Sequence, residues 1–180
     1  MHCLGMLLLL LLQSVQSGPP RDMPAEPGVY YRQEDGGWVK LNPAVVAQMR
    51  HEGVELFVDT GGYTNLGMKG MLQPSRAAAR ISASRPTLYV RGVGAPGDVV
   101  LIQLKRENDR RVFETSSVDA TVENKGGFRK KDMRNTAVVV YSDSSFSVTP
   151  EQALKEGEYL LCFGYAQSGF DFGVDLKRRQ

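Results

Sequence analysis

The chain has 180 residues, with 22 Lys and Arg against 20 Asp and Glu, and a formal net charge of +2 at pH 7. A balance this mild does not by itself require an anionic partner. Two histidines and two cysteines are too few for a metal centre that is built from several His or Cys ligands.

The first seventeen residues are predicted to be a signal peptide. The apolar run from Leu4 to Leu12 is shorter than the roughly 20 residues of a transmembrane helix, and it has the length of a signal-peptide core. Val15 and Ser17 are small residues suited to a cut before Gly18. Because no basic segment precedes the run, an uncleaved membrane anchor is the alternative. We expect an exported protein, periplasmic or extracellular, that is not an integral membrane protein after cleavage.

Residues 18–27 are predicted to be a Pro-rich leader, and residues 28–180 a single domain, since about 150 residues is a common domain size. The leader contains four prolines, which favours an extended, weakly ordered segment. From Gly28 onward, short apolar runs alternate with Gly, Asp and Asn, and this pattern indicates strands. The first two strands form a predicted hairpin with its turn at Asp35 and Gly36.

One short helix is predicted to begin at Asn42 and end at Gly53. Asn42 is a good N-cap, and Pro43 suits the first helical turn. A second hairpin is predicted over residues 98–117, with its turn at Asn108 and Asp109. Further strands are predicted at residues 54–58, 80–84, 87–92, 137–141, 146–149, 158–164 and 170–174, because β-branched and aromatic residues are dense there. Residues 59–74 and 122–135 are predicted to be long loops.

The segment from Leu154 to Tyr159 predicts a structural corner of a β-sandwich. Leu154 would fill the edge of the core, and Gly157 would take a left-handed turn that side chains resist. The hydroxyl of Tyr159 would then bond to the backbone a few residues upstream. We therefore expect an all-β fold, an antiparallel β-sandwich of immunoglobulin-like type with one short helix. A small β-barrel is the alternative.

Three stretches of the chain resemble a known group of proteins. They are "PGVYYRQEDGGWVKL", "ARISASRPTLYVRG" and "FSVTPEQALKEGEYLLCFG". They are similar to a group of uncharacterised exported proteins of bacterial envelopes, with a Gly-Val-Tyr-Tyr opening and a Gly-Glu-Tyr closing strand. The resemblance implies an exported β-rich domain. It implies no catalytic or binding residues.

Few residues suit catalysis. His51 is the one histidine after the signal segment, and its predicted helix looks solvated, so a Ser-His-Asp triad is not expected. Cys162 lies within an apolar strand and is predicted to be core. A glycosidase needs only two carboxylates, but no spacing singles out a pair. The candidates are Asp59, Glu107, Glu114, Asp119 and Asp171.

Two surfaces are candidates for binding. Arg129, Lys130, Lys131 and Arg134 form a basic cluster that suits an anionic envelope polymer or lipid surface; a solvated loop is the plainer interpretation. Trp38 and Tyr63 are candidates for an aromatic surface that stacks on sugars. Of Tyr30 and Tyr31, one is expected in the core, since neighbours in a strand face opposite ways.

The expected function is that of a non-catalytic interaction or structural module of the bacterial cell envelope. The alternative is a carbohydrate- or anionic-polymer-binding protein, and a carboxylate-dependent hydrolase is a more distant third. No cofactor or metal is expected. An envelope protein or an anionic envelope polymer is the expected partner, and nucleic acid is disfavoured by the export signal.

Overall fold

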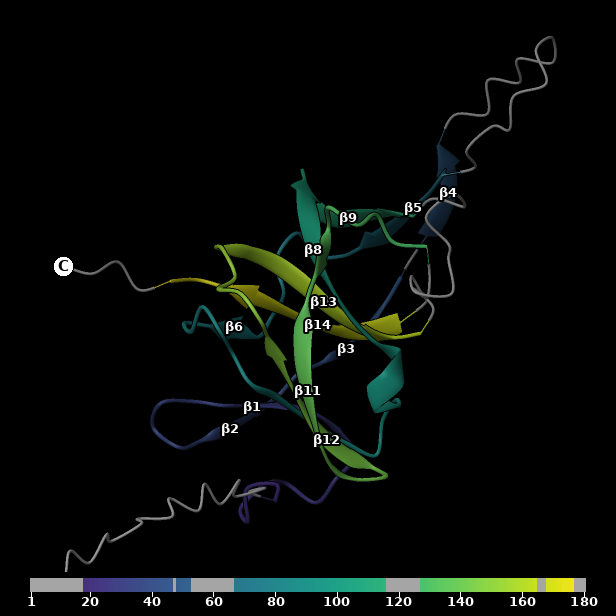
Figure 1. The fold of residues 1–180 in the computed structure, drawn as a ribbon. Coiled ribbons are helices and arrows are strands. Elements are labelled where there is room, and N and C mark those ends of the chain that lie inside the picture. The colour runs from purple at the N-terminus through teal and green to yellow at the C-terminus, as the bar shows by residue number, and fades with distance from the viewer. Residues whose placement is uncertain (1–17, 47, 53–66, 116–126, 165–167, 177–180) are drawn as a thin grey trace, which may run out of the picture.

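The computed structural model describes residues 18–46, 48–52, 67–115, 127–164 and 168–176. It confirms an all-β fold built of antiparallel sheets (Figure 1). Within these described ranges, the helical content is one 3-10 turn, η1 (Pro96–Asp98). Two sheets enclose the main core, and the larger sheet is strongly curled, so the architecture combines features of a sandwich and a small barrel.

The first sheet has five strands in the order β11-β12-β7-β1-β2. Its strands are β1 (Gly28–Arg32), β2 (Trp38–Lys40), β7 (Leu88–Arg91), β11 (Thr136–Ser142) and β12 (Ser145–Pro150). The predicted turn between β1 and β2 is confirmed: Gly36 has a φ of 89°, and its N–H donates to the carbonyl of Gln33 at 3.0 Å.

The second sheet follows the order β3-β14-β13-β8-β9-β5-β4. Its strands are β3 (Pro43–Val45), β4 (Gln48–Glu52), β5 (Gly67–Leu72), β8 (Val99–Glu107), β9 (Arg110–Thr115), β13 (Gly157–Phe163) and β14 (Ser168–Val174). Two short strands join beside this path: β6 (Arg80–Ile81) runs parallel to β14, and β10 (Met133–Arg134) pairs with β8. Asn108, at a φ of 51°, forms the predicted turn between β8 and β9.

The predicted helix from Asn42 to Gly53 is wrong. The chain instead forms β3, which pairs with β14, and β4, which pairs with β5. Pro43 begins β3, and this position suits proline because β3 lies at the edge of its sheet. Likewise, β5 occupies part of the predicted loop 59–74. The predicted strand 54–58 lies outside the described residues.

The main core lies between the two sheets. Val29, Val90 and Phe146 enter it from the first sheet, and Leu161 and Phe172 enter it from the second. All five are fully buried. Alternate residues of each strand face this core, as period-two patterning requires.

A smaller second core lies on the other face of the curled sheet. Ile102, Leu160 and Cys162 line it from β8 and β13, and Phe113 packs against Phe128 with ring centroids 5.6 Å apart. Strands β8 and β13 are consequently buried on both faces. Cys162, with 0% exposure, lies in this second core, as its apolar strand predicted.

The Pro-rich leader is packed against the first hairpin, which differs from the weakly ordered segment predicted. Met23 is buried, and its N–H donates to the carbonyl of Pro20 at 3.0 Å. The carboxylate of Asp22 accepts hydrogen bonds from Arg32 at 2.9 Å and from the indole N–H of Trp38 at 3.3 Å. These contacts stabilise an ordered course for a segment whose composition favours disorder.

Candidate anion-binding groove

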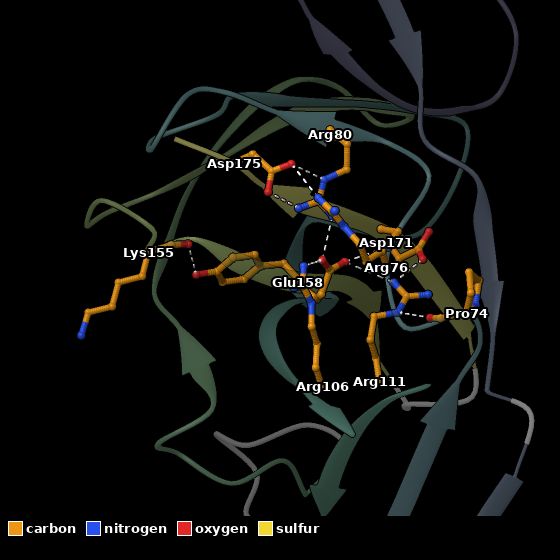
Figure 2. Close-up of polar contacts among 11 residues, drawn as sticks. Pro74, Arg76, Arg80, Arg106, Arg111, Lys155, Glu158, Asp171 and Asp175 are labelled. Carbon is orange, nitrogen blue, oxygen red and sulfur yellow. Dashed lines mark hydrogen bonds and ion pairs between the residues drawn. The ribbon is translucent and has the colours of Figure 1, made fainter. Parts of the chain in front are cut away.

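A cluster of four arginines and three carboxylates lies at the start of β13 (Figure 2). It comprises Arg76, Arg80, Arg106, Arg111, Glu158, Asp171 and Asp175, and we call it the arginine–carboxylate cluster. Glu158, at 0% exposure, accepts hydrogen bonds from the backbone N–H of Ala77 at 2.8 Å, from Arg80 at 2.7 Å and from Arg106. Such saturation is what a buried charge requires.

The other two carboxylates extend the cluster across β9, β14 and the segment before β6. Asp171 accepts from Arg111 at 2.5 Å, and Arg111, which is 1% exposed, also donates to the carbonyl of Pro74 at 2.8 Å. Asp175 accepts from Arg80 at 2.8 Å and from Arg76 at 3.1 Å. The cluster thus ties residues 74–80 to the second sheet.

Glu158 is poorly suited to act as a general acid. Burial by itself would raise the pKa of Glu158, but the hydrogen bonds from Ala77, Arg106 and Arg80 outweigh it and lower the pKa below its usual value. A general acid needs the opposite shift. Among the carboxylates proposed for a hydrolase, Glu107 pairs with Lys69, Glu114 with Lys105 and Arg129, and Asp171 with Arg111. Asp59 and Asp119 lie outside the described residues.

Tyr159 makes the backbone bond that a tyrosine corner requires. Its hydroxyl donates to the carbonyl of Lys155 at 2.8 Å, while Leu154 is buried in the main core. Gly157 has a φ of 158°, close to extended backbone, and not the left-handed turn predicted. Its lack of a side chain serves a close approach instead, because a Cβ there would lie 3.1 Å from Nε2 of Gln103.

A second corner of the same form begins β1, and it was not predicted from the sequence. The hydroxyl of Tyr30 donates to the carbonyl of Glu26 at 2.9 Å, again four residues upstream. Gly28 also has a φ of 158°. The shared Gly-x-Tyr spacing, at residues 28–30 and 157–159, was the signal that could have identified it.

The structure divides the predicted basic cluster into three kinds of environment. Arg129 forms an ion pair with Glu114. Lys130 and Lys131 are exposed on a turn, and no ion pair joins either of them to another described residue. Arg134 is fixed by donating to the carbonyls of Lys131 at 2.9 Å and Met133 at 2.7 Å and to Oε1 of Gln103.

Arg134 and Lys155 line a hollow that we call the polar groove. Its volume is about 360 Å³, and it is lined by Gln103, Met133, Arg134, Asn135, Gln152, Ala153 and Lys155. These residues include two cations and three amides but no carboxylate. The groove lies between β10 and the connection from β12 to β13, so it brings together parts of the chain that are distant in sequence.

Trp38 lies in a packed aromatic group on the outer face of the first sheet. Its ring centroid is 6.5 Å from that of Tyr30 and 5.2 Å from that of Tyr89, both in edge-to-face orientation. The guanidinium of Arg32 lies 5.6 Å from the ring centroid of Trp38. Tyr63, the other predicted aromatic residue, lies outside the described residues. Tyr31 faces the main core and Tyr30 faces outward.

Cys162 and His51 were the two residues considered for thiol or imidazole chemistry. Burial raises the pKa of Cys162 to about 12, which suppresses the reactive thiolate. His51 lies on β4 and not on a helix. In the part of the chain that the structure describes, no cluster of His, Cys, Asp and Glu could hold a metal ion, and no helix is long and apolar enough to cross a membrane. Comparison with protein-family models, curated proteins and solved structures found no match.

Proposed function

We propose that this protein is an exported, non-catalytic binding module of the bacterial cell envelope, which docks on an acidic polymer. The docking region is the basic surface, which we define as Lys130, Lys131, Arg134 and Lys155. The apolar run from Leu4 to Leu12 supports export, since it has the length of a signal-peptide core.

The observation that carries the proposal is the absence of paired acids at these four cations. Many other cations of the described chain, among them Arg32, Lys69 and Arg129, pair with a carboxylate. Lys130, Lys131, Arg134 and Lys155 form no such ion pair with a described residue. Uncompensated positive charge at one place attracts a polyanion, and the attraction weakens as salt screens it.

Retention on immobilised polygalacturonate and on immobilised polyphosphate tests the proposal, with residues 18–180 and a NaCl gradient. Each exposed cation near an anionic surface contributes about 1 kcal/mol at low salt. Substitution of both Lys130→Gln and Lys131→Gln should therefore weaken binding roughly tenfold or more and lower the salt concentration of elution.

A matched control removes two cations elsewhere. Arg21→Gln with Lys40→Gln changes the net charge equally, and both side chains are exposed near the first hairpin. This variant should elute with the wild type. Equal losses in both variants would mean that only net charge matters, and absence of retention on either polymer would refute the proposal. A salt-resistant envelope protein as the captured partner would also count against it.

A further inference from the structure

We propose that the polar groove is a subsite for one carboxylated sugar unit of the acidic polymer. This inference rests on the proposed function and specifies its ligand. Polymer docking needs only exposed charge, whereas recognition of a sugar unit needs a shaped hollow with oriented polar groups. The polar groove has both, and its cations are accompanied by amides.

Arg134 is the receptor for the carboxylate. Its guanidinium is held by the carbonyls of Lys131 and Met133 and by the amide oxygen of Gln103. These acceptors fix the position of the guanidinium. Because they carry no formal charge, they do not neutralise its positive charge. A fixed guanidinium matches the planar carboxylate group better than a mobile ammonium does.

Lys155 supplies the second cation of the groove. The hydroxyl of Tyr159 bonds to its backbone carbonyl at 2.8 Å, so the tyrosine corner fixes the chain from which the ammonium extends. The exposed side chain of Lys155 remains able to adapt to the ligand. Arg134 therefore sets the orientation of the carboxylate, and Lys155 adds attraction.

The amides of Gln103, Asn135 and Gln152 are the groups that recognise the hydroxyls of the sugar. An amide group both donates and accepts hydrogen bonds, as a sugar hydroxyl does, while a phosphate chain offers only acceptors at neutral pH. Met133 and Ala153 give the groove apolar wall for the C–H face of a ring. A volume of about 360 Å³ is at the small end for ligand pockets, which suits one sugar unit.

The surroundings also set the course of the polymer. Across Gln103 lies a second hollow of about 350 Å³ whose lining includes Glu156. Its arginines are already paired, Arg76 with Asp175 and Arg106 with Glu158. An anionic chain gains little there, so it leaves the polar groove along Lys131 and Lys130.

Calorimetric titration of residues 18–180 with trigalacturonate, neutral trigalactose and a short polyphosphate tests the subsite. We expect trigalacturonate to bind at least tenfold more tightly than either of the others. Arg134→Gln should remove this preference. Gln152→Ala should weaken trigalacturonate severalfold and leave polyphosphate unchanged, because only the sugar offers hydroxyls.

Two comparisons keep the test decisive if Arg134→Gln disturbs the fold. Lys155→Gln leaves the backbone carbonyl in the corner bond intact, and it should weaken trigalacturonate severalfold. Arg21→Gln lies outside both the polar groove and the basic surface and should not change the trigalacturonate-to-trigalactose ratio. Equal affinities for polyphosphate and trigalacturonate would overturn the sugar subsite while the proposed function stood. Failure of both anions to bind would overturn both.

Discussion

At Glu158, three arginines converge on one buried carboxylate. Arg80 and Arg106 donate to it, and Arg111 lies 3.8 Å away. Glu158→Gln would leave these cations without their shared acid. Removal of one partner from a buried ion pair costs about 3 to 5 kcal/mol. We expect about 3 kcal/mol, because the side chain of Arg106 is 46% exposed and water compensates part of the loss.

Urea unfolding at pH 7 measures this loss. Asp175→Asn is the matched control, since Asp175 shares Arg80 but is 49% exposed, and it should cost about 1 kcal/mol or less. Similar losses in the two variants would contradict the special role of burial at Glu158.

The same carboxylate predicts a dependence on pH. The pKa of Glu158 is lower in the folded protein than the ordinary 4.5, so its stabilisation is fully present above pH 4.5 and is lost as the pH falls through the folded pKa. Wild-type stability should therefore decline in acid more steeply than that of Glu158→Gln. Parallel acid profiles, recorded by urea unfolding between pH 7 and pH 3, would show that Glu158 is not responsible.

The two tyrosine corners predict matched effects. Tyr159→Phe and Tyr30→Phe each remove one hydroxyl bond to a backbone carbonyl, at 2.8 and 2.9 Å. Each should lower the free energy of unfolding by about 1 kcal/mol, and the double variant should show the sum, since separate sites add. A double variant no less stable than either single variant would contradict this.

Individual residues differed in how far the sequence predicted them. The corner at Tyr159 followed from a local Gly-x-Tyr pattern. The arginine–carboxylate cluster did not, because Ala77, Arg80 and Arg106 are 81, 78 and 52 residues from Glu158. The available signal was one acidic residue within the apolar strand "EYLLCFG", which implies a hidden partner.

At the scale of elements, the sequence predicted strands where β-branched and aromatic residues are dense. From Asn42, however, it predicted a helix where the chain forms β3 and β4. Local cap chemistry favoured a helix there. Pairing of β3 with β14 and of β4 with β5 decided the outcome, since tertiary contacts override weak local preferences. Turns were predictable at Gly36 and Asn108 because Gly and Asn favour the positive φ angles that these turns require.

Strand β11 shows that an apolar sequence does not identify which strands lie at the edge of a sheet. It forms an edge of the first sheet, and Val139 and Val140 are 50% and 54% exposed. No charged residue interrupts Thr136–Ser142. The register shift between Val140 and Ser142 breaks the regular edge, and such an irregularity hinders further pairing.

Because β14 pairs with β6, we predict that Gly173 does not tolerate a side chain. A Cβ at Gly173 would overlap the guanidinium of Arg80, which pairs with Glu158 and Asp175. Gly173→Ala should therefore lower the melting temperature by several degrees, as a loss of about 2 kcal/mol does in a domain of this size. Gly97→Ala, where nothing lies within 4 Å of the added Cβ, is the control and should change little.

At the scale of the whole molecule, net charge and composition did not reveal the polar groove. Arg134 was identified as a basic residue, but the groove forms only where β10 meets the connection that contains Gln152 and Lys155. Similarly, the sequence predicted β8 as part of a hairpin, while the second core depends on Phe128 returning to Phe113. Such meetings of distant segments follow from topology and not from local pattern.

Cys162 can serve as a probe of unfolding of the whole domain, because it lies in the second core at 0% exposure. With a pKa of about 12, its thiol should react with a thiol reagent such as DTNB at pH 8 only when the fold opens. In residues 18–180 it is the one cysteine. We expect labelling in native buffer to be at least a hundredfold slower than in denaturant; comparable rates would contradict the burial.

The two cores share one wall, and this restricts how the sequence can vary. On β13, the run from Tyr159 to Cys162 is fully buried, because successive residues face alternate cores. A substitution at any of the four positions therefore disturbs one core or the other. In a saturation mutagenesis scan, β13 would form a continuous block of low tolerance, whereas ordinary strands with one solvent face would tolerate change at every second position.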